Sequence, residues 1–195
     1  MMRVIAGTLG GRRLTPVPGR ATRPTADRVR EALFSRLESR YRLAGIRVLD
    51  LFAGTGALGI EALSRGAARL VSVELDRRAA RVLIANLQAC ALEGRAEVHV
   101  RDALAMLGTL ARGQSRFEGV FVDPPYGMGL AVDALETLAR EGLVEEGGWV
   151  VLETSLQEEV PQRAGRLRRV RDDRYGDTRL ALYELADEGE DRVDD

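Results

Sequence analysis

The chain has 195 residues, of which 45% are hydrophobic and 30% are charged. This balance is typical of a soluble globular protein that can bury a full core. The apolar runs are too short to span a bilayer and the first residues lack a signal-peptide pattern, so we expect a cytoplasmic protein without a membrane partner. The single cysteine, Cys90, and the single histidine, His99, exclude an internal disulfide and Cys-cluster or multi-His metal sites. We therefore predict that no metal is bound.

The two ends of the chain carry opposite charges. Residues 1–42 contain ten Arg and three acidic residues, a net charge of +7, whereas residues 184–195 contain seven acidic residues and one Arg, a net charge of -6. A basic segment on a near-neutral protein indicates a face that binds a polyanion. The alternative is the arginine usage of a GC-rich genome with a solvated acidic tail, which explains why all 29 basic residues are Arg but not their uneven placement.

The first 42 residues predict a small basic extension. Residues 2–15 are expected to form a short hairpin that turns through Gly10 and Gly11. A helix follows, with Thr25 as its N-cap and an apolar stripe at Val29, Leu33, Leu37 and Tyr41. Its N-terminal end, which carries Arg23 and Thr25, favours an anion such as a carboxylate or a phosphate.

From residue 46 the pattern alternates between strands and helices. Strands are predicted over residues 46–50, 68–74, 96–100, 117–122 and 149–153. Helices are predicted after Gly56, over residues 77–92, from Asp102 and over residues 130–140. An antiparallel strand pair is predicted over residues 167–173 and 178–185. This order predicts a doubly wound, Rossmann-like α/β sheet, mostly parallel with an antiparallel edge, and with the N-terminal extension added. The expected domains are 1–42, 43–186 and an acidic tail, 187–195, which we expect to be disordered.

A glycine loop follows the first of these strands. Its three glycines fit the pattern G-x-G-x-x-G: Gly54, Gly56 and Gly59. The pattern places a ligand over the strand with its ribose on Glu74, but it does not distinguish a dinucleotide from S-adenosylmethionine. Asp50 favours a ligand with an ammonium group over one with a pyrophosphate, unless it only caps a turn or a helix. Asp102 could accept a hydrogen bond from an adenine amino group or cap the next helix, and both roles are compatible.

The segment Asp123-Pro124-Pro125-Tyr126 follows the buried strand 117–122. Two prolines cannot continue a strand, so the chain leaves the sheet in a stiff, extended loop. The loop thus presents an acid and an aromatic ring at the carboxyl end of a strand, where open α/β sheets bind ligands. A hydrogen-bond acceptor beside a ring suits a flat, amino-bearing base. The alternative is a proline-bounded loop with a solvated Asp.

Together, several motifs carry a family resemblance: Arg23-Pro24-Thr25, residues 27–31, Asp50 to Gly56, Glu74, Asp102 and the Asp123 loop. The chain resembles the class I S-adenosylmethionine-dependent methyltransferases. More closely, it is similar to the bacterial enzymes that methylate the exocyclic N2 amine of one guanine in 16S ribosomal RNA. The resemblance implies S-adenosylmethionine as cofactor, S-adenosylhomocysteine as product, guanine 966 of the RNA as target, and a monomer acting on free RNA or on a small ribosomal subunit.

The resemblance also implies roles for the matched residues. Asp50 and the glycine loop would hold the methionine end of the cofactor, Glu74 its ribose and Asp102 its adenine. The whole implied cofactor set is Arg23, Thr25, Asp50, Phe52, Ala53, Gly54, Thr55, Gly56, Glu74, Leu75, Asp102, Ala103 and Asp123. The catalytic set that would hold a flipped guanine is Asp123, Pro124, Pro125 and Tyr126. The implied RNA-binding residues are Arg3, Arg12, Arg13, Arg28 and Arg30.

Three other functions fit part of the sequence. A DNA adenine-N6 methyltransferase would use the same Asp123 loop, but no separate DNA-reading domain is visible in 195 residues. An NAD-dependent oxidoreductase would use the glycine spacing and leave the Asp123 loop unexplained. A non-catalytic RNA-binding module would not need an intact acid-proline-proline-aromatic sequence.

Overall fold

The computed structural model describes residues 2–18 and 24–186. The chain divides into two compact units, Met1–Ala103 and Leu104–Asp195. Within the described residues, no helix has both the length and the apolarity needed to cross a membrane.

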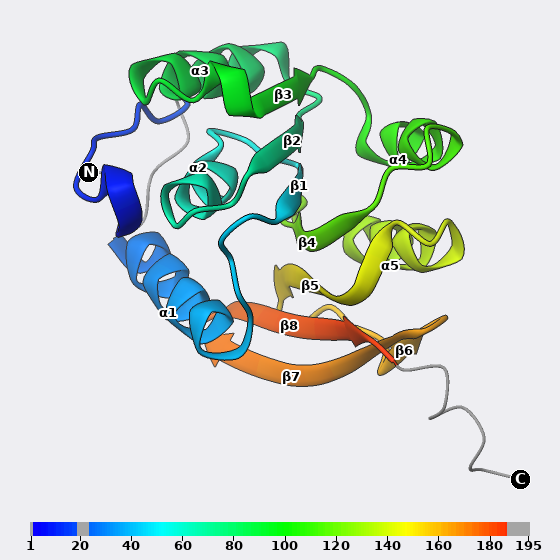
Figure 1. Cartoon of the computed structure of the whole chain (residues 1–195). Helices are drawn as coiled ribbons and strands as arrows, with labels where there is room; N and C mark the ends of the chain where they lie inside the picture. The colour runs from blue at the N-terminus through cyan, green and yellow to red at the C-terminus, as the bar shows by residue number, and fades with distance from the viewer. Residues whose placement is uncertain (1, 19–23, 187–195) are drawn as a thin grey trace, which may run out of the picture. The chain divides into compact units, whose positions relative to one another are not determined.

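The first unit is built on a three-stranded parallel sheet with the order β3-β2-β1 (Figure 1). Its elements are η1 (Gly7–Leu9), α1 (Pro24–Arg40), β1 (Arg47–Leu51), α2 (Ala57–Ser64), β2 (Arg69–Val73), α3 (Arg77–Ala89), η2 (Glu93–Arg95) and β3 (Ala96–His99). The side chains of β1 and β2 are buried after the first residue of each strand, as expected for parallel strands covered on both faces. The alternation predicted for this half of the chain is therefore confirmed.

The N-terminal segment forms the expected hairpin. The peptide N–H of Val4 donates to the carbonyl of Arg12 over 2.9 Å, and that of Leu14 donates to Met2 over 3.0 Å. The side chains of Met2, Val4 and Leu14 are buried. The hairpin lies against α2 and α3 within the first unit (Figure 1), so its apolar side chains are covered by packing on those helices.

Helix α1 buries three residues of the predicted stripe, with Val29, Leu33 and Leu37 all below 10% exposure. The fourth, Tyr41, lies beyond the end of the helix at Arg40 and is half-buried. The helix begins at Pro24, two residues before the first helical position expected after a Thr25 N-cap. Proline suits the first position of a helix because its missing N–H would have no partner there. Thr25 is the second residue of the helix, so its prediction as the N-cap is wrong. The anion contact predicted for Arg23 concerns a residue outside the described part of the chain.

The second unit contains a five-stranded mixed sheet with the order β4-β5-β8-β7-β6. Its elements are α4 (Ala103–Arg112, which starts at the last residue of the first unit), β4 (Phe117–Val122), α5 (Leu130–Arg140), β5 (Val144–Ser155), β6 (Arg163–Ala164), β7 (Leu167–Tyr175) and β8 (Thr178–Leu185). Strands β4 and β5 are parallel, and the pairs that follow are antiparallel. The α/β class with an antiparallel edge is confirmed. The edge is broader than predicted, since β6 was not expected and β5 is longer.

The core of the second unit is organised by Trp149 on β5. Its indole meets Phe121 edge to face, with the ring centroids 5.1 Å apart, a favourable aromatic geometry. A Cβ atom on Gly119 would lie 2.4 Å from the indole, so only glycine lets β4 pass this close. This packing fixes the end of β4, from which the Asp123 loop leaves the sheet.

Candidate functional site

The three glycines of the loop in the first unit are required by backbone conformation, by close packing or by both. Gly54 and Gly56 have φ angles of +56° and +79°, which side chains disfavour. A Cβ atom on Gly56 would lie 2.1 Å from Leu83 Cδ1, and one on Gly59 would lie 2.7 Å from Leu70. The spacing thus combines a tight turn with close packing of α2 on the sheet and on α3. These are the physical roles of the G-x-G-x-x-G pattern.

Two acidic side chains approach this loop. Asp50, at the end of β1, is only 1% exposed, and its carboxylate accepts a hydrogen bond from the Gly59 N–H over 3.0 Å. Burial raises the pKa of Asp50 to about 7, and the nearby Glu74 carboxylate also raises it. Glu74 accepts hydrogen bonds from the N–H groups of Gly54 and Asp76, each over 2.7 Å. Asp50 thus binds the backbone at the start of α2, which agrees with the alternative that it caps a helix. A carboxylate in this position still has further lone pairs with which it can bind a ligand.

The rest of the loop is held by backbone and side-chain contacts. Ala53 N–H donates to the Val73 carbonyl over 2.9 Å, and Phe52 has a φ of +62°, a strained value for a residue with a side chain. The carbonyl of Thr55 accepts from the Asn86 side chain over 3.0 Å. The loop is therefore shaped before any ligand arrives.

Apolar surface lies next to the acids. Leu75, which follows Glu74, is 65% exposed, and Val100, beyond β3, is 48% exposed. Asp102 is also exposed, whereas Ala103 is buried at the start of α4. An exposed apolar side chain beside buried acids suits a ligand with a flat ring at one end and a cationic group at the other. The predicted residues of the first unit that the structure describes therefore fit S-adenosylmethionine.

In the second unit, the Asp123 loop presents its residues differently. Pro124 is buried and Asp123 is partly buried, whereas Pro125 is exposed and Tyr126 is 43% exposed. The phenol of Tyr126 donates to Glu153 Oε1 over 2.9 Å and lies 3.1 Å from the hydroxyl oxygen of Thr178. Burial, and then the neighbouring carboxylate, raise the pKa of Tyr126, so its phenol stays protonated and can donate. The ring is thus open to a partner while its tip is anchored.

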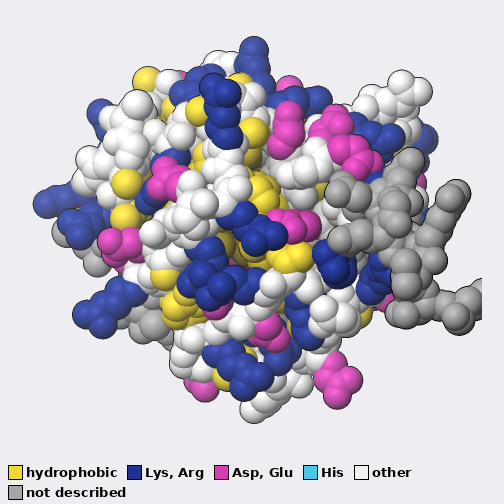
Figure 2. Space-filling model, turned by 60° about the horizontal axis from the view of Figure 1, so that its bottom comes forward, with side chains coloured by type: hydrophobic (Ala, Val, Ile, Leu, Met, Phe, Trp, Pro, Cys, Tyr) yellow, Lys and Arg dark blue, Asp and Glu magenta, His cyan; other side chains and the backbone are white. Residues whose placement is uncertain are grey.

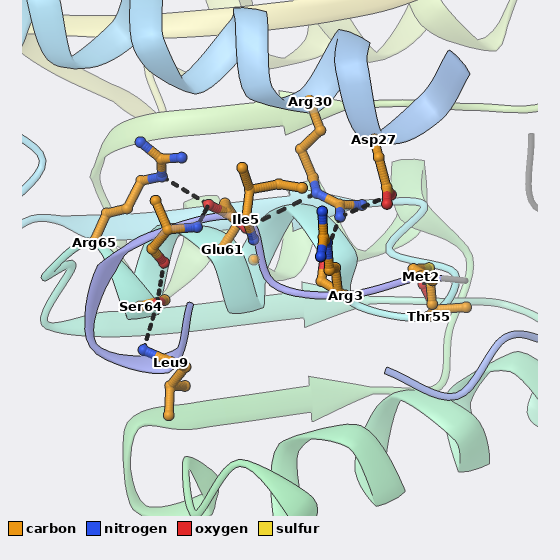
Figure 3. A network of polar contacts seen from close by, with 12 residues as sticks. Met2, Arg3, Ile5, Leu9, Asp27, Arg30, Thr55, Glu61, Ser64 and Arg65 are labelled. Atoms are coloured by element: carbon orange, nitrogen blue, oxygen red, sulfur yellow. Dashed lines mark hydrogen bonds and ion pairs between the residues drawn. The ribbon is translucent and has the colours of Figure 1, made fainter. Parts of the chain in front are cut away.

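The predicted RNA-binding arginines separate into two groups. Arg3, Arg12, Arg13 and Arg28 are exposed, and Arg12 also donates to the Ala89 carbonyl at the end of α3. Arg30 is only 6% exposed; it donates to the Arg3 carbonyl and to Asp27 over 3.1 Å (Figure 3). The burial of Arg30 favours a structural role in holding the hairpin over direct contact with RNA.

A buried polar cluster attaches the hairpin to α2 (Figure 3). Glu61, which is fully buried, accepts from the N–H groups of Ile5 over 2.7 Å and Ala6 over 3.0 Å, and from Arg65 over 2.8 Å. Ser64 donates to the Ala6 carbonyl over 2.6 Å and accepts from the Leu9 N–H over 3.0 Å. These bonds satisfy peptide groups that would otherwise be unpaired in the interface. The cluster therefore fixes the basic hairpin to the helix that begins after the glycine loop.

The charged side chains are mixed over the visible surface. Figure 2 shows Arg side chains in dark blue between acidic side chains in magenta and apolar ones in yellow. Within the described residues, no group of three or more His, Cys, Asp and Glu side chains is arranged to hold a metal ion. Cys90 is buried as a free thiol.

Four residues with a role at these sites were missed from the sequence: Glu61, Asn86, Glu153 and Thr178. Each contacts its partner across 27 or more positions of the chain. For Glu61 and Asn86, the sequence offered one indication of such a role. Both are polar side chains on helices that pack on the sheet, at positions where an apolar side chain is expected. A buried polar side chain needs a partner, but the pattern does not say which one.

The fold and these sites are those of an α/β protein with a glycine loop that suits an adenosyl cofactor. The chain matches the family model described as "Conserved hypothetical protein 95" over residues 2–184. It is 36% identical to ribosomal RNA small subunit methyltransferase D of Escherichia coli over 194 residues, which cover 99% of this chain and 94% of the relative. It is also 41% identical to YlbH of Bacillus subtilis over 93% of this chain and 98% of that protein. The chain therefore belongs to the ribosomal RNA small subunit methyltransferase D family.

The solved structures agree with this assignment. The structure of yhhF from Escherichia coli has a TM-score of 0.82 and 32% sequence identity, and the match covers 95% of this chain and 98% of the other. A Thermus protein described as hypothetical has a TM-score of 0.79 and 35% identity, with 95% and 100% covered.

Proposed function

We propose that this protein transfers a methyl group from S-adenosylmethionine to the exocyclic N2 amine of one guanine in 16S ribosomal RNA, expected at position 966. The observation that carries the proposal is the 36% identity to the Escherichia coli enzyme across nearly the whole of both chains. The local geometry of each unit supports it, because the first unit suits the cofactor and the second suits a base. We also propose that the protein is a cytoplasmic monomer and that residues 1–42 act as its RNA-binding extension.

The first unit would hold the cofactor. The buried carboxylate of Asp50 would accept from the ammonium group, Glu74 would bind the ribose hydroxyls, and Leu75 would pack on the adenine. The exposed Asp102 would accept from the adenine amine. When bound, S-adenosylmethionine supplies a methyl group that is already electrophilic because it is carried on a sulfonium. The task left to the chain is to orient the nucleophile.

The second unit would orient that nucleophile. The lone pair of an exocyclic guanine amine is delocalised into its ring. Asp123 and the carbonyl of Pro124 would accept hydrogen bonds from the amine, favour a more tetrahedral nitrogen and stabilise the positive charge that develops on it. Tyr126 would stack on the flipped base, a contact worth about 1–3 kcal/mol. Most of the acceleration would come from alignment of the reacting atoms.

The exposed arginines of the extension would bind the RNA backbone. Arg3, Arg12, Arg13 and Arg28 are exposed, and arginine on a surface binds phosphate without reading the sequence. The polar cluster around Glu61 would keep the hairpin in place while it binds. The choice of one guanine would then depend on RNA shape around the target.

The experiment is a methyl-transfer assay with labelled S-adenosylmethionine, run on naked 16S ribosomal RNA and on the assembled small subunit. Calorimetry with S-adenosylhomocysteine and with NAD is run beside it. We expect transfer to at least one of the two RNA substrates and binding of S-adenosylhomocysteine but not of NAD. Binding of NAD alone would support the oxidoreductase alternative, and cofactor binding with transfer only to DNA would support the DNA methyltransferase.

A further inference from the structure

The ring of Tyr126 is anchored by two neighbouring strands of the second unit. Glu153 lies on β5 and accepts from the phenol over 2.9 Å, while Thr178 is the first residue of β8 and lies 3.1 Å from it. The two strands are antiparallel partners, with Ser155 opposite Thr178 and Glu153 opposite Leu180. The anchor is therefore built into the sheet.

The direction of these hydrogen bonds follows from the chemistry of the groups. A phenol has one proton, and the Glu153 carboxylate can only accept. With that proton donated to Glu153, the Thr178 hydroxyl must donate to the phenol oxygen. Burial raises the pKa of Tyr126, so the phenol keeps the proton that it donates. The two hydrogen bonds thus run in one direction, from Thr178 through Tyr126 to Glu153.

The loop around Tyr126 could otherwise move. Gly127 and Gly129 have φ angles of +77° and +70°, and a Cβ atom on either would have open space around it. Met128 between them is 64% exposed. A ring in such a segment, without a contact at its tip, would sample several rotamers before a base arrives.

We propose that Glu153 and Thr178 are positioning residues that hold the Tyr126 ring in place as a preformed stacking surface for the target base. The inference rests on the proposed function, in which Tyr126 stacks on guanine. It assigns no direct contact with the base to Glu153. Because the carboxylate acts through the phenol, removing Glu153 should not lower the rate of methyl transfer further when the phenol is already absent.

The test is a double-mutant cycle measured by single-turnover methyl transfer to the RNA substrate. Tyr126→Phe and Glu153→Ala are each expected to lower kcat/KM about tenfold, and the double variant is expected to lose no more than either single variant. Glu153→Gln, which keeps an acceptor oxygen, should lose less than Glu153→Ala. The affinity for S-adenosylhomocysteine should stay unchanged in all of them. Glu146→Ala, on the same strand but paired with Arg166, is the matched control and should have the wild-type rate.

Two outcomes would overturn the inference. A further tenfold loss in the double variant would show that Glu153 acts on its own, for example directly on the base. A wild-type rate for Glu153→Ala would show that the anchor has no effect on the reaction.

A second readout does not depend on activity. Tyrosine labelled with ¹³C at the hydroxyl-bearing carbon gives one NMR signal for each of the four tyrosines, and the signal lost in Tyr126→Phe identifies Tyr126. We expect this signal to titrate at higher pH than free tyrosine in the wild type, first through burial, and to move part of the way back in Glu153→Ala. An unchanged titration in Glu153→Ala would contradict the anchor. If the anchor is seen but the wild type methylates no RNA, the proposed function fails while the anchor stands.

Discussion

The glycine loop and the Asp123 loop, the two sites that we propose bind ligands, are built in opposite ways. In the glycine loop the acids are buried and bonded to backbone N–H groups, as Asp50 is to Gly59 and Glu74 to Gly54. In the Asp123 loop Tyr126 is 43% exposed, and its hydroxyl is bonded to the side chain of Glu153. A small ligand that binds the same way in every turnover suits a prebuilt backbone cradle. A base that must leave a large RNA suits an open side chain with a fixed position.

Asp50, which is buried, and Glu153, which is partly buried, show the same contrast. Burial raises the pKa of both Asp50 and Glu153. Asp50 bonds to a peptide N–H that shapes a helix start, whereas Glu153 bonds to a side chain that we propose contacts the substrate. The predicted consequence is that changes in the first unit alter cofactor affinity and changes in the second alter turnover.

The largest expected effect is that of Asp123→Ala. Because the lost acceptor would act mainly on the developing charge, turnover should fall by about 10²–10³-fold, with S-adenosylhomocysteine affinity nearly unchanged. Single-turnover kinetics and calorimetry measure the two quantities. Wild-type-like turnover would remove Asp123 from the mechanism, and a parallel loss of affinity would break the contrast between the two loops.

A pair of glycine substitutions compares the loops directly. Gly56 and Gly127 have similar φ angles, +79° and +77°, so alanine is strained at both, by about 1–2 kcal/mol. Only at Gly56 would the new Cβ meet Leu83, at 2.1 Å. Overpacking adds about 1–3 kcal/mol, so Gly56→Ala should lower the free energy of unfolding by more than Gly127→Ala. Denaturant unfolding measures both, and equal losses would contradict the packing role of Gly56.

The affinity for the cofactor should depend on pH through Asp50. Its pKa in the folded protein is raised from 3.8 to about 7, and an ammonium group would bind the charged carboxylate. Affinity for S-adenosylhomocysteine should therefore fall up to tenfold for each pH unit below 7 and level off above it, as measured by calorimetry between pH 5.5 and 7.5. Asp50→Asn should bind weakly and flatten the profile; an unchanged profile in that variant would assign the dependence to another group.

The same shift has the opposite sign for folding. Between pH 3.8 and about 7 the folded chain keeps a proton on Asp50 that the unfolded chain has lost. The contribution of Asp50 to stability is therefore present below pH 3.8 and is lost as the pH rises through 7.

The smallest effect is expected from the exposed arginines. Arg12→Gln with Arg13→Gln should weaken RNA binding and reduce the slope of log affinity against log salt by about 1.5, since each lost phosphate contact removes roughly 0.7–0.9. Filter binding across a salt series measures the slope. An unchanged slope would show that Arg12 and Arg13 do not contact RNA phosphates, and that RNA binds elsewhere on the protein.

Local patterns predicted the elements that depend on local chemistry. The bounds of β4, α5 and β8 agree with those predicted, because apolar runs and glycine turns mark them. The spacing of Gly54, Gly56 and Gly59 located the glycine loop, but not the close packing on Leu83 and Leu70 that two of them allow. The stiffness that two prolines give the Asp123 loop was equally readable.

Contacts between distant residues could not be read in the same way. Nothing near Glu153 in the sequence indicates that its partner is Tyr126, 27 positions earlier, and the carboxylate of Glu61 meets the N–H of Ile5 across 56 positions. Arg30 was grouped with the surface arginines because its sequence neighbours are basic, yet the fold buries it against Asp27. The partners of such side chains are determined by tertiary packing and not by the residues next to them in the sequence.

Methylation of a guanine amine is the central step of the proposed function. The direct measurement is mass spectrometry of nucleosides from 16S ribosomal RNA incubated with the protein and S-adenosylmethionine, with the modified position mapped by fragments. We expect N2-methylguanosine at a single position, formed far more slowly when Asp123→Ala replaces the wild type. Methylation of adenine, or no methylated nucleoside from either naked RNA or the small subunit, would contradict it.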